Sequence, residues 1–524
     1  MGFVVSERLE ALSDRRLLFL CAAAIFVACA WPLVLVELPP YQDVPNHIAS
    51  VIVMENPAEY PAFVANGLFK TNAAVYAWVH LLSGVMGHVW AMRLFIVFLL
   101  ATGAFAYPSL LLEISGRRAM VMGSLFAPPF VHNWFVAMGM LNFALGVAFA
   151  MLTIVAMQRA RSAPSVGGRL LVALLGVATW YAHAVPFTLL LLLFLVELAV
   201  AVRVSRKDGL SFAKHAGLPL GIAVAVALVR RVSDLGSGKG GFIYTPPWTS
   251  LYNLWAEWAY SFTPLGAATI VSCGLLLVLA LRRFREKIPF FSPASFVVLI
   301  LLFAAAPHSM AGAYYFNARV AGFLWLAMLV RVPPELPRPV VAGLVAIMLS
   351  FSASLGIDFV RLSRERAQFD EGIPHVAERA QLLPFIFDRK GSSANTRHMM
   401  QAWGTYTLEK HAAAPLVFAH SRTYGVSYST PPPELLDHVE LELQIDQLGS
   451  EAAFCANDQE KETCAARYRE RWQQLYDVVT PRFDHLLFWG ASNDVLANVP
   501  APYARVFERG KLVIYAREGP RGAW

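Results

Sequence analysis

The stretch Tyr41-Gln-Asp-Val-Pro-Asn-His47 begins a few residues after the first long apolar segment of the chain, which covers residues 17–37. It marks the point where a membrane-spanning pattern gives way to a long polar loop. Asp43 and His47 have two interpretations: solvated loop residues, or a proton acceptor and its neighbour at the mouth of an intramembrane enzyme. The rest of the chain decides between them.

Composition indicates a polytopic α-helical membrane protein. The chain has 524 residues, of which 57% are hydrophobic and 15% charged, and its mean hydropathy is +0.51. The apolar residues fall in runs of about 18–22, the length of a membrane span. The formal net charge of +7 does not indicate a nucleic-acid partner, because the basic residues gather at the ends of apolar segments and not on one polar face.

Apolar segments long enough to cross about 30 Å of hydrocarbon predict eleven spans. They cover residues 17–37, 92–113, 118–135, 140–158, 168–183, 185–203, 214–231, 263–281, 292–307, 317–331 and 338–358. Within the membrane region, residues 1–360, most Arg and Lys residues lie in connections that are cytoplasmic if the N-terminus is cytoplasmic. We therefore expect a multi-pass protein of the cell inner membrane with its C-terminus in the periplasm or outside the cell.

The span count depends on the first outer loop, residues 38–91. Its stretch 73–88 is apolar but short for a span, and Tyr76, Trp78 and His80 suit the membrane surface. We expect a helix that lies on the membrane. A short transmembrane helix is the alternative, and it would invert the charge bias of every later loop.

Two domains are expected, a membrane domain at 1–360 and a soluble extracytoplasmic domain at 361–524. The second region is rich in charge and has no apolar run of span length. Apolar runs at 415–419, 485–489 and 511–515 predict strands, and 433–448 and 458–478 predict helices. This pattern is typical of a small α/β or α+β domain.

Cysteine usage is consistent with this placement. Cys455 and Cys464 lie close together in the outer domain and are a disulfide candidate, as expected in an oxidising compartment; two free cysteines are the alternative. The sequence contains no CxxC, HExxH or paired Cys/His spacing, so no zinc site is predicted.

This arrangement resembles the GT-C glycosyltransferases, which include the bacterial aminoarabinose transferases and the protein O-mannosyltransferases. Asp43 matches the acid of the family's first outer loop. Lys70-Thr-Asn-Ala-Ala-Val-Tyr76-Ala-Trp78 is similar to a family segment of the type Lys-Pro-Pro-Leu-Tyr-Tyr-Trp, with Thr71 and Asn72 in place of the prolines. Arg93-Leu-Phe and Gly116-Arg-Arg118 resemble the start and inner end of the next span.

The resemblance implies transfer of a sugar from a polyprenyl-phosphate donor to a lipid, glycan or protein acceptor on the outer side of the membrane. Such a reaction needs a base, which we expect to be Asp43, with His47 orienting it or acting beside it. It also needs cations for the lipid phosphate, and we expect Lys70 and Arg319. Further residues that could line the site at outer helix ends are His183, His308 and Tyr314.

Other functions stay open at this stage. The same spans could form a non-enzymatic lipid-linked-glycan transporter or an assembly protein, because intramembrane charges also mark substrate pathways. An O-antigen-type polymerase is a third class. No cofactor is predicted with certainty, and the sequence does not decide whether a divalent metal assists, which sugar and acceptor are used, or the oligomeric state.

Overall fold

The computed structural model describes residues 11–234, 242–256, 258, 267–310, 313–419, 422–456, 458 and 460–517. The chain divides into two compact units. The membrane unit comprises Met1–Glu37, Phe69–Val75 and Arg93–Phe359. The second unit comprises Leu38–Leu68, Tyr76–Met92 and Val360–Trp524, so most of the first loop groups with the C-terminal region.

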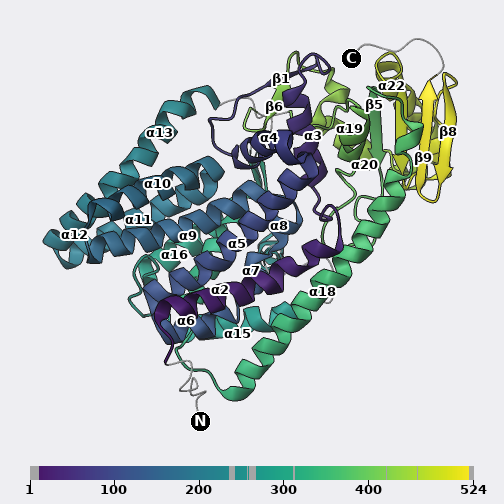
Figure 1. Ribbon diagram of the computed structural model, residues 1–524. Helices are drawn as coiled ribbons and strands as arrows, with labels where there is room; N and C mark the ends of the chain where they lie inside the picture. Colours follow the sequence, from purple (N-terminus) through teal and green to yellow (C-terminus); the bar gives the residue numbers. More distant parts are fainter. Residues whose placement is uncertain are drawn as a thin grey trace. The chain divides into compact units, whose positions relative to one another are not determined.

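Helices make up the membrane unit (Figure 1). They are α2 (Asp14–Ala30), η1 (Trp31–Leu35), α5 (His88–Ser115), α6 (Arg117–Ser124), α7 (Pro128–Val131), α8 (Trp134–Ala137), α9 (Leu141–Ser162), α10 (Val166–Ala182), α11 (Ala184–Val204), α12 (Arg206–Phe212), η2 (Ala213–Gly217), α13 (Leu218–Asp234), α14 (Pro247–Ala256), α15 (Thr269–Arg282), α16 (Pro293–Ala305), α17 (Phe316–Leu329) and α18 (Arg338–Asp370). The boundary between the units falls within α5, within α18 and within the helix at Ala74–Met86.

Among the described residues, six helices are long and apolar enough to cross a membrane, and five shorter apolar helices accompany them. The predicted fold class, a polytopic helical membrane protein with a C-terminal α/β or α+β region, is confirmed. Of the eleven predicted spans, six fall on the helices of spanning length, and four, at 168–183, 263–281, 292–307 and 317–331, fall on shorter helices; residues 263–266 lie outside the described residues. The prediction for residues 118–135 is wrong, because they form three short helices and not one. Pro128 and Pro129 lack the backbone N–H that a continuous helix needs, and the Asn133 side chain starts α8 by accepting from Val136 N.

The helices of the membrane unit pack closely. Helix α10 packs on α9 and α13, and α17 packs on α14, α15 and α16. Figure 1 shows α9, α10 and α11 side by side. Thr153 and Thr179 join α9 to α10 through a hydroxyl–hydroxyl hydrogen bond of 3.2 Å, a polar link that is common between helices in lipid.

A small three-stranded antiparallel sheet also belongs to the membrane unit. Its strands are β2 (Phe242–Ile243), β3 (Ser309–Met310) and β4 (Ala313–Tyr314), in the order β2-β3-β4. The sheet leads directly into α17, whose N-cap residue Tyr315 has a left-handed backbone (φ 61°). Residues other than Gly and Asn rarely adopt this conformation, so the entry to α17 is a constrained turn.

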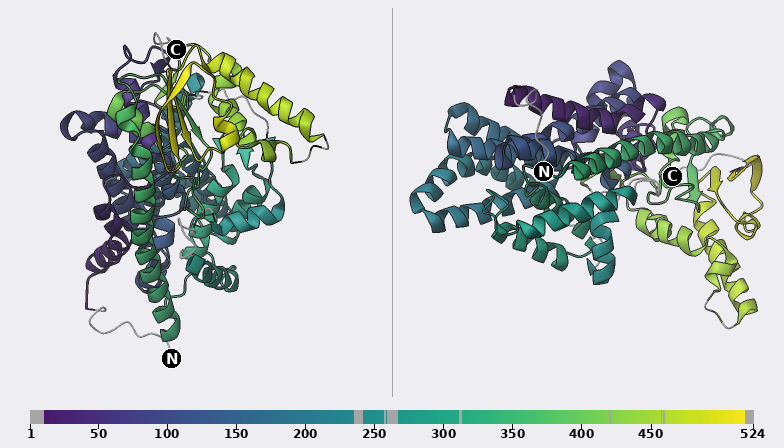
Figure 2. Two further views of the ribbon diagram at one scale, coloured as in Figure 1. Left: turned by 90° about the vertical axis from the view of Figure 1, so that its right-hand side faces the viewer. Right: turned by 90° about the horizontal axis from the view of Figure 1, so that it is seen from below.

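The second unit mixes helices and strands. Its elements are α3 (Val44–Glu55), β1 (Phe63–Ala65), α4 (Ala74–Met86), η4 (Ile373–His375), β5 (Leu382–Ile386), α19 (Gly404–Lys410), β6 (Val426–Tyr428), η5 (Glu434–Leu436), α20 (His438–Gln447), α21 (Glu451–Phe454), α22 (Lys461–Val479), β7 (His485–Trp489), α23 (Asn493–Leu496), β8 (Tyr503–Arg509) and β9 (Leu512–Arg517). Its main sheet has the order β5-β7-β9-β8, with β5 parallel to β7 and the other pairs antiparallel. The yellow strands β8 and β9 lie side by side in Figure 1, and Figure 2 shows the same strands from two further directions.

The strand predictions for this unit are partly correct. His485–Trp489 and Leu512–Arg517 are strands, and β5 was not predicted. Its Pro384 argues against a central strand, but β5 is an edge strand, where Pro is tolerated.

The predicted strand at 415–419 is wrong, because this stretch forms turns. Its backbone groups bond to side chains instead of a strand ladder: Leu416 O accepts from Asn46 Nδ2, Phe418 N donates to Asn46 Oδ1, and Pro415 O accepts from the Tyr428 hydroxyl.

The first loop is built into this second unit at two places. Strand β1 pairs with β6 in antiparallel register, Phe63 opposite Tyr428. Helix α3 packs on α19, where Gly404 lies so close that an added Cβ would be 2.4 Å from Pro45 O. Only glycine allows this approach, since backbone atoms cannot swing away as a flexible side chain can.

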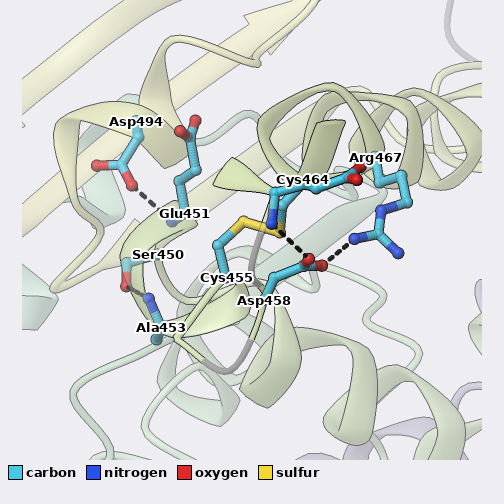
Figure 3. Close-up of a disulfide and its surroundings, with 9 residues drawn as sticks. Ser450, Glu451, Ala453, Cys455, Asp458, Cys464, Arg467 and Asp494 are labelled. Atoms are coloured by element: carbon cyan, nitrogen blue, oxygen red, sulfur yellow. Dashed lines mark hydrogen bonds and ion pairs between the residues drawn. A yellow bond between two sulfur atoms is a disulfide. The ribbon is translucent and has the colours of Figure 1, made fainter. Parts of the chain in front are cut away.

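Cys455 and Cys464 form a disulfide between the end of α21 and the first turn of α22 (Figure 3). Short polar contacts surround it: Ser450 caps α21 by accepting from Ala453 N, Glu451 N donates to Asp494, and Asp458 pairs with Arg467. The two cysteines are 9 positions apart in sequence, so the disulfide closes a short loop.

Candidate functional site

Asp43 occupies the N-cap position of α3, but its side chain does not cap the helix. Pro45 in the first turn lacks an N–H, and the Asp43 carboxyl turns to Gln42, whose Nε2 donates to Asp43 Oδ1 at 3.1 Å. Asp43 is only 8% exposed. Its carboxyl is therefore held out of water and is not spent on ordinary helix capping.

Burial raises the pKa of Asp43 to about 7. The hydrogen bond from Gln42 opposes this rise, and the charge of Glu442 adds to it. A carboxyl with this pKa changes its proton occupancy close to neutral pH, which is the property expected of a general base. Because structural acids can have raised pKa values too, its surroundings matter.

His47 lies one turn along α3 from Asp43, and His47 N donates to Asp43 O at 2.9 Å. Its Nδ1 shares a hydrogen bond of 3.1 Å with the Tyr76 hydroxyl. The ring also packs edge-on against Tyr76 and Phe418, with centroids 5.5 and 5.7 Å away. These contacts fix the imidazole, so His47 is an oriented group on the same side of α3 as Asp43.

Asn46 ties the start of α3 to the C-terminal region of the same unit. Its Nδ2 donates to Gln401 Oε1 and to Leu416 O, both at 2.9 Å, and its Oδ1 accepts from Phe418 N at 3.1 Å. Asn46 is fully buried, and each bond satisfies a group that would otherwise be costly to bury. The residues around Asp43 are thus positioned by chain segments far away in sequence.

Helix α20 supplies a second acid of the same kind. Glu442 is 21% exposed, and its carboxylate lies 3.5 Å from His438 Nε2. Burial raises the pKa of Glu442 to about 7, against the opposing charge of Arg389. Burial also lowers the pKa of His438 to about 4, so this imidazole is neutral at physiological pH.

Arg389 holds α20 in place through Asp446 and the carbonyl of Glu442, each at 3.1 Å.

In the membrane unit, Arg319 and His183 form the centre of a second group. Arg319 Nη1 lies 3.0 Å from His183 Nε2, and its Nη2 is 3.9 Å from Met140 Sδ. The guanidinium stands 5.5 Å from the Phe143 ring centroid, and His183 packs edge-on against the same ring. The structure therefore brings together two of the residues expected from the sequence.

The His183 ring faces two donors. Its Nδ1 accepts from Val185 N at 3.1 Å, which starts α11, so in the neutral ring Nε2 carries the proton. With Nε2 protonated, His183 and the Arg319 guanidinium are both donors, and their nitrogens lie 3.0 Å apart. An oxyanion bound beside them would accept from both once the two N–H groups turn towards it, as phosphate oxygens do.

Lys70 belongs to a segment anchored at the same helix ends. Thr71 Oγ1 donates to Trp180 O of α10 at 2.8 Å, and Asn142 of α9 donates to Asn72 O and accepts from Val75 N. Asn142 precedes Phe143, and Trp180 precedes His183 by three residues. Lys70, which is 5% exposed, is thus placed on the helix ends that also hold the Arg319 group.

His308 and Tyr314 lie around Tyr315 at the entry to α17. The His308 and Tyr315 rings are 5.0 Å apart, and the Tyr314 and Tyr315 rings are 6.4 Å apart. Tyr314 is 43% exposed. Both rings contact Tyr315, and the Tyr315 carbonyl accepts from Arg319 N. Tyr315 therefore links His308 and Tyr314 to the Arg319 group.

Within the described part of the chain, no group of three or more His, Cys, Asp or Glu side chains is arranged to hold a metal ion. Glu55 is bound by His80 Nδ1 at 2.9 Å and His88 Nε2 at 2.8 Å, each on a different carboxylate oxygen. This cluster joins the end of α3 to α4 and to the start of α5.

Several residues of the site were missed by sequence reasoning. These are Gln42, Asn46, Tyr76, Phe418, His438 and Glu442. Gln42 and Asn46 lie close to Asp43 in the sequence. If Asp43 is buried, its polar neighbours are buried too and need hydrogen-bond partners, and this argument could have identified both residues. The α20 residues carry no comparable signal, because their sequence reads as an ordinary charged helix.

Comparisons with known proteins agree with this architecture. Neither the scan against protein-family models nor the search of curated proteins finds a match. Solved structures do match, and they give the chain a GT-C-like fold, which confirms the resemblance as a statement about fold.

Two of the matching structures are crystal structures of ArnT from Cupriavidus metallidurans. The apo state has a TM-score of 0.53 and 13% sequence identity, over 94% of this chain and 97% of that chain. The structure bound to undecaprenyl phosphate has a TM-score of 0.46 and 13% identity, over 96% and 97%.

The electrostatic link between Asp43 and Glu442 can be tested by titration. Glu442→Gln removes a like charge, so the pKa of Asp43 should fall below about 7. Infrared difference spectroscopy against pH, with the Asp43 carboxylic-acid band assigned by its loss in Asp43→Asn, gives the midpoint directly. Glu440→Gln on the same helix is the matched control and should leave the midpoint in place; an unchanged midpoint in Glu442→Gln would show that the two acids are independent.

Proposed function

We propose that this protein is a GT-C-type membrane glycosyltransferase that moves a sugar from a polyprenyl-phosphate donor to a lipid, glycan or protein acceptor. The observation that carries the proposal is the Asp43 carboxyl: buried at the start of α3, uninvolved in capping, with a pKa near neutral. It occurs in a chain whose fold is GT-C-like. Neither observation alone would support the activity.

Asp43 is the general base in this proposal. As the acceptor oxygen or nitrogen attacks the anomeric carbon, the bond from that carbon to the phosphate oxygen breaks, and the acceptor proton passes to Asp43. Base catalysis works best when the pKa of the base lies near the working pH, because the base is then ionised and still holds the proton well. Burial gives Asp43 this pKa.

His47 orients the acceptor beside Asp43. Its ring is fixed by the Tyr76 hydroxyl and by Phe418, and it lies one helical turn from the base. A fixed imidazole nitrogen can hold a substrate hydroxyl in the direction needed for attack.

Arg319, His183 and Lys70 bind the donor phosphate. The facing donors of Arg319 and His183 suit an oxyanion, and the N-terminus of α9, beginning at Leu141 beside Phe143, adds a favourable dipole for negative charge. The leaving lipid phosphate gains charge during transfer, so donors already in place stabilise the transition state more than the ground state.

The reaction takes place on the outer side of the inner membrane. The distribution of Arg and Lys between the loops supports a cytoplasmic N-terminus, and the Cys455–Cys464 disulfide supports an oxidising compartment for the second unit. Polyprenyl-phosphate donors would reach the protein from the lipid phase.

Asp43→Asn should abolish transfer while the protein stays folded and inserted. Asparagine keeps the size of the side chain but cannot accept a proton, and general-base contributions are typically about 10²–10⁴-fold. The measurement is glycan transfer by purified protein in lipid with a polyprenyl-phosphate sugar. Glu55→Gln and Glu59→Gln, in the same loop, are the controls and should retain activity.

A stability measurement separates loss of chemistry from loss of fold. The pKa of Asp43 in the folded protein lies above its ordinary value, so wild-type stability falls as pH rises from about 4 to about 7. Asp43→Asn removes this cost and should be at least as stable as wild type above pH 7. Near-wild-type turnover in Asp43→Asn would overturn the mechanism, and retained glycan transport without transfer would favour a transporter.

Replacing the cationic residues proposed to bind the donor phosphate should weaken use of the donor selectively. Lys70→Ala and Arg319→Gln should each cost about 1–3 kcal/mol, the range for losing a charged hydrogen bond, seen as a lower kcat/KM for the donor. Arg203→Gln, at the exposed end of α11, is the control. Unchanged donor kinetics in either site variant would remove that residue from the phosphate site.

Orientation is tested by reporters. An alkaline phosphatase fused to the C-terminus should be active, and Cys455 and Cys464 should resist alkylation in intact cells unless a reductant is added. A cytoplasmic reporter that is active at the same position would contradict the proposed topology.

A further inference from the structure

Arg366, near the end of α18, makes an unusual set of contacts inside the second unit. It is only 4% exposed, and its guanidinium donates to three backbone carbonyls: Pro39 O at 3.3 Å, Tyr41 O at 3.2 Å and His398 O at 2.7 Å. Two of these carbonyls belong to residues four and two positions before Asp43 in the sequence. The third belongs to the C-terminal region.

These bonds fix a piece of chain that has no secondary structure of its own. Residues 39–41 lie between η1 and α3 and make no helix or strand ladder. A planar guanidinium presents several donors in a rigid fork, so it can hold carbonyls from two segments at once. A lysine ammonium keeps the charge but lacks this geometry.

A second connection joins the same two segments one residue closer to the base. Gln42 Oε1 accepts from Arg397 N at 3.2 Å, while Gln42 Nε2 donates to Asp43 Oδ1. Tyr41 is thus linked to His398 through Arg366, and Gln42 bonds directly to Arg397. Gln42 passes this restraint to the Asp43 carboxyl.

We propose that Arg366 is a positioning residue that sets the Asp43 carboxyl by clamping the 39–41 backbone to the 397–398 backbone. The inference rests on the proposed function and adds to it a role for the C-terminal region: it completes the site by orienting the base, and it does not touch the substrate. Arg366 acts through Asp43 alone.

The groups that bear on the Asp43 carboxyl come from several elements of the unit. Gln42 bonds to it directly, Glu442 of α20 repels its charge, and Tyr76 of α4 is within electrostatic range. Loosening the 39–41 segment would let water reach the carboxyl, which would favour its ionised form. The acid limb of the pH–rate profile should then move to lower pH.

The test compares Arg366→Lys and Arg366→Gln with Arg364→Lys, an exposed arginine on the same helix. In purified protein in lipid, we expect kcat to fall about 10–100-fold in the Arg366 variants, with the donor KM unchanged, since misplacing a catalytic group by about 1 Å costs a factor of this size. Arg366→Lys should be less impaired than Arg366→Gln. Arg364→Lys should match wild type.

A second readout does not depend on activity. The infrared band of protonated Asp43 should titrate at lower pH in folded Arg366→Lys than in wild type. An unchanged midpoint with wild-type kcat would overturn the inference, and so would unfolding of both Arg366 variants, because Arg366 would then serve the fold as a whole. If Asp43→Asn proves fully active, the proposed function fails, while a shifted Asp43 band in Arg366→Lys would still show that the clamp sets this carboxyl.

Discussion

The hydrogen bonds of one buried amide, Asn46, hold together the region on which the site depends. Asn46 bonds to Gln401, Leu416 and Phe418, and in doing so it substitutes for a strand ladder at 415–419. A buried amide that loses these partners would leave several unsatisfied polar groups, each costly in a low-dielectric interior. The start of α3, and with it Asp43 and His47, therefore has one well-defined position.

That position explains the chemistry of the carboxyl. A solvated aspartate in a loop would have an ordinary pKa and would be fully ionised at neutral pH. Asp43 is instead buried beside an amide and within the field of Glu442, and both burial and like charge favour the protonated form. The hydrogen bonds of Asn46 and Gln42 hold the carboxyl in this buried position despite the cost, and perturbed pKa values of this kind are common at functional sites.

The candidate site residues of the membrane unit are cations and an imidazole, in contrast to the acids of the second unit, and they are held in a different way. Arg319 and His183 stand at helix ends and pack on Phe143, while Lys70 lies in a segment fastened by Thr71 and Asn142. Cations at helix ends can remain charged where a midplane cation would be expensive, because they reach the polar edge of the bilayer. A site built in this way suits a ligand whose charged group lies at the lipid surface.

The sequence by itself determined that the protein is a helical membrane protein, and it pointed to Asp43 as the candidate base. Runs of apolar residues require helices in a membrane, since only helices satisfy their backbone internally there, and the polar run at Asp43 interrupts this pattern visibly. The sequence also indicated Arg319, His183 and Lys70, because charged and imidazole groups stand out at apolar segment ends. Local pattern was sufficient for each of these.

Tertiary structure alone decided how these residues are used. The pairing of Arg319 with His183, the field of Glu442 on Asp43 and the clamp of Arg366 on the 39–41 backbone each join residues more than a hundred positions apart. The wrong predictions of a strand at 415–419 and of a single helix at 118–135 also have a cause that hydrophobic periodicity does not show. At 415–419 the Asn46 amide binds the backbone groups that a strand would pair, and at 118–135 prolines lack the N–H of a continuous helix. Hydrogen-bond satisfaction and burial depend on which segments meet, and no local window of sequence contains that information.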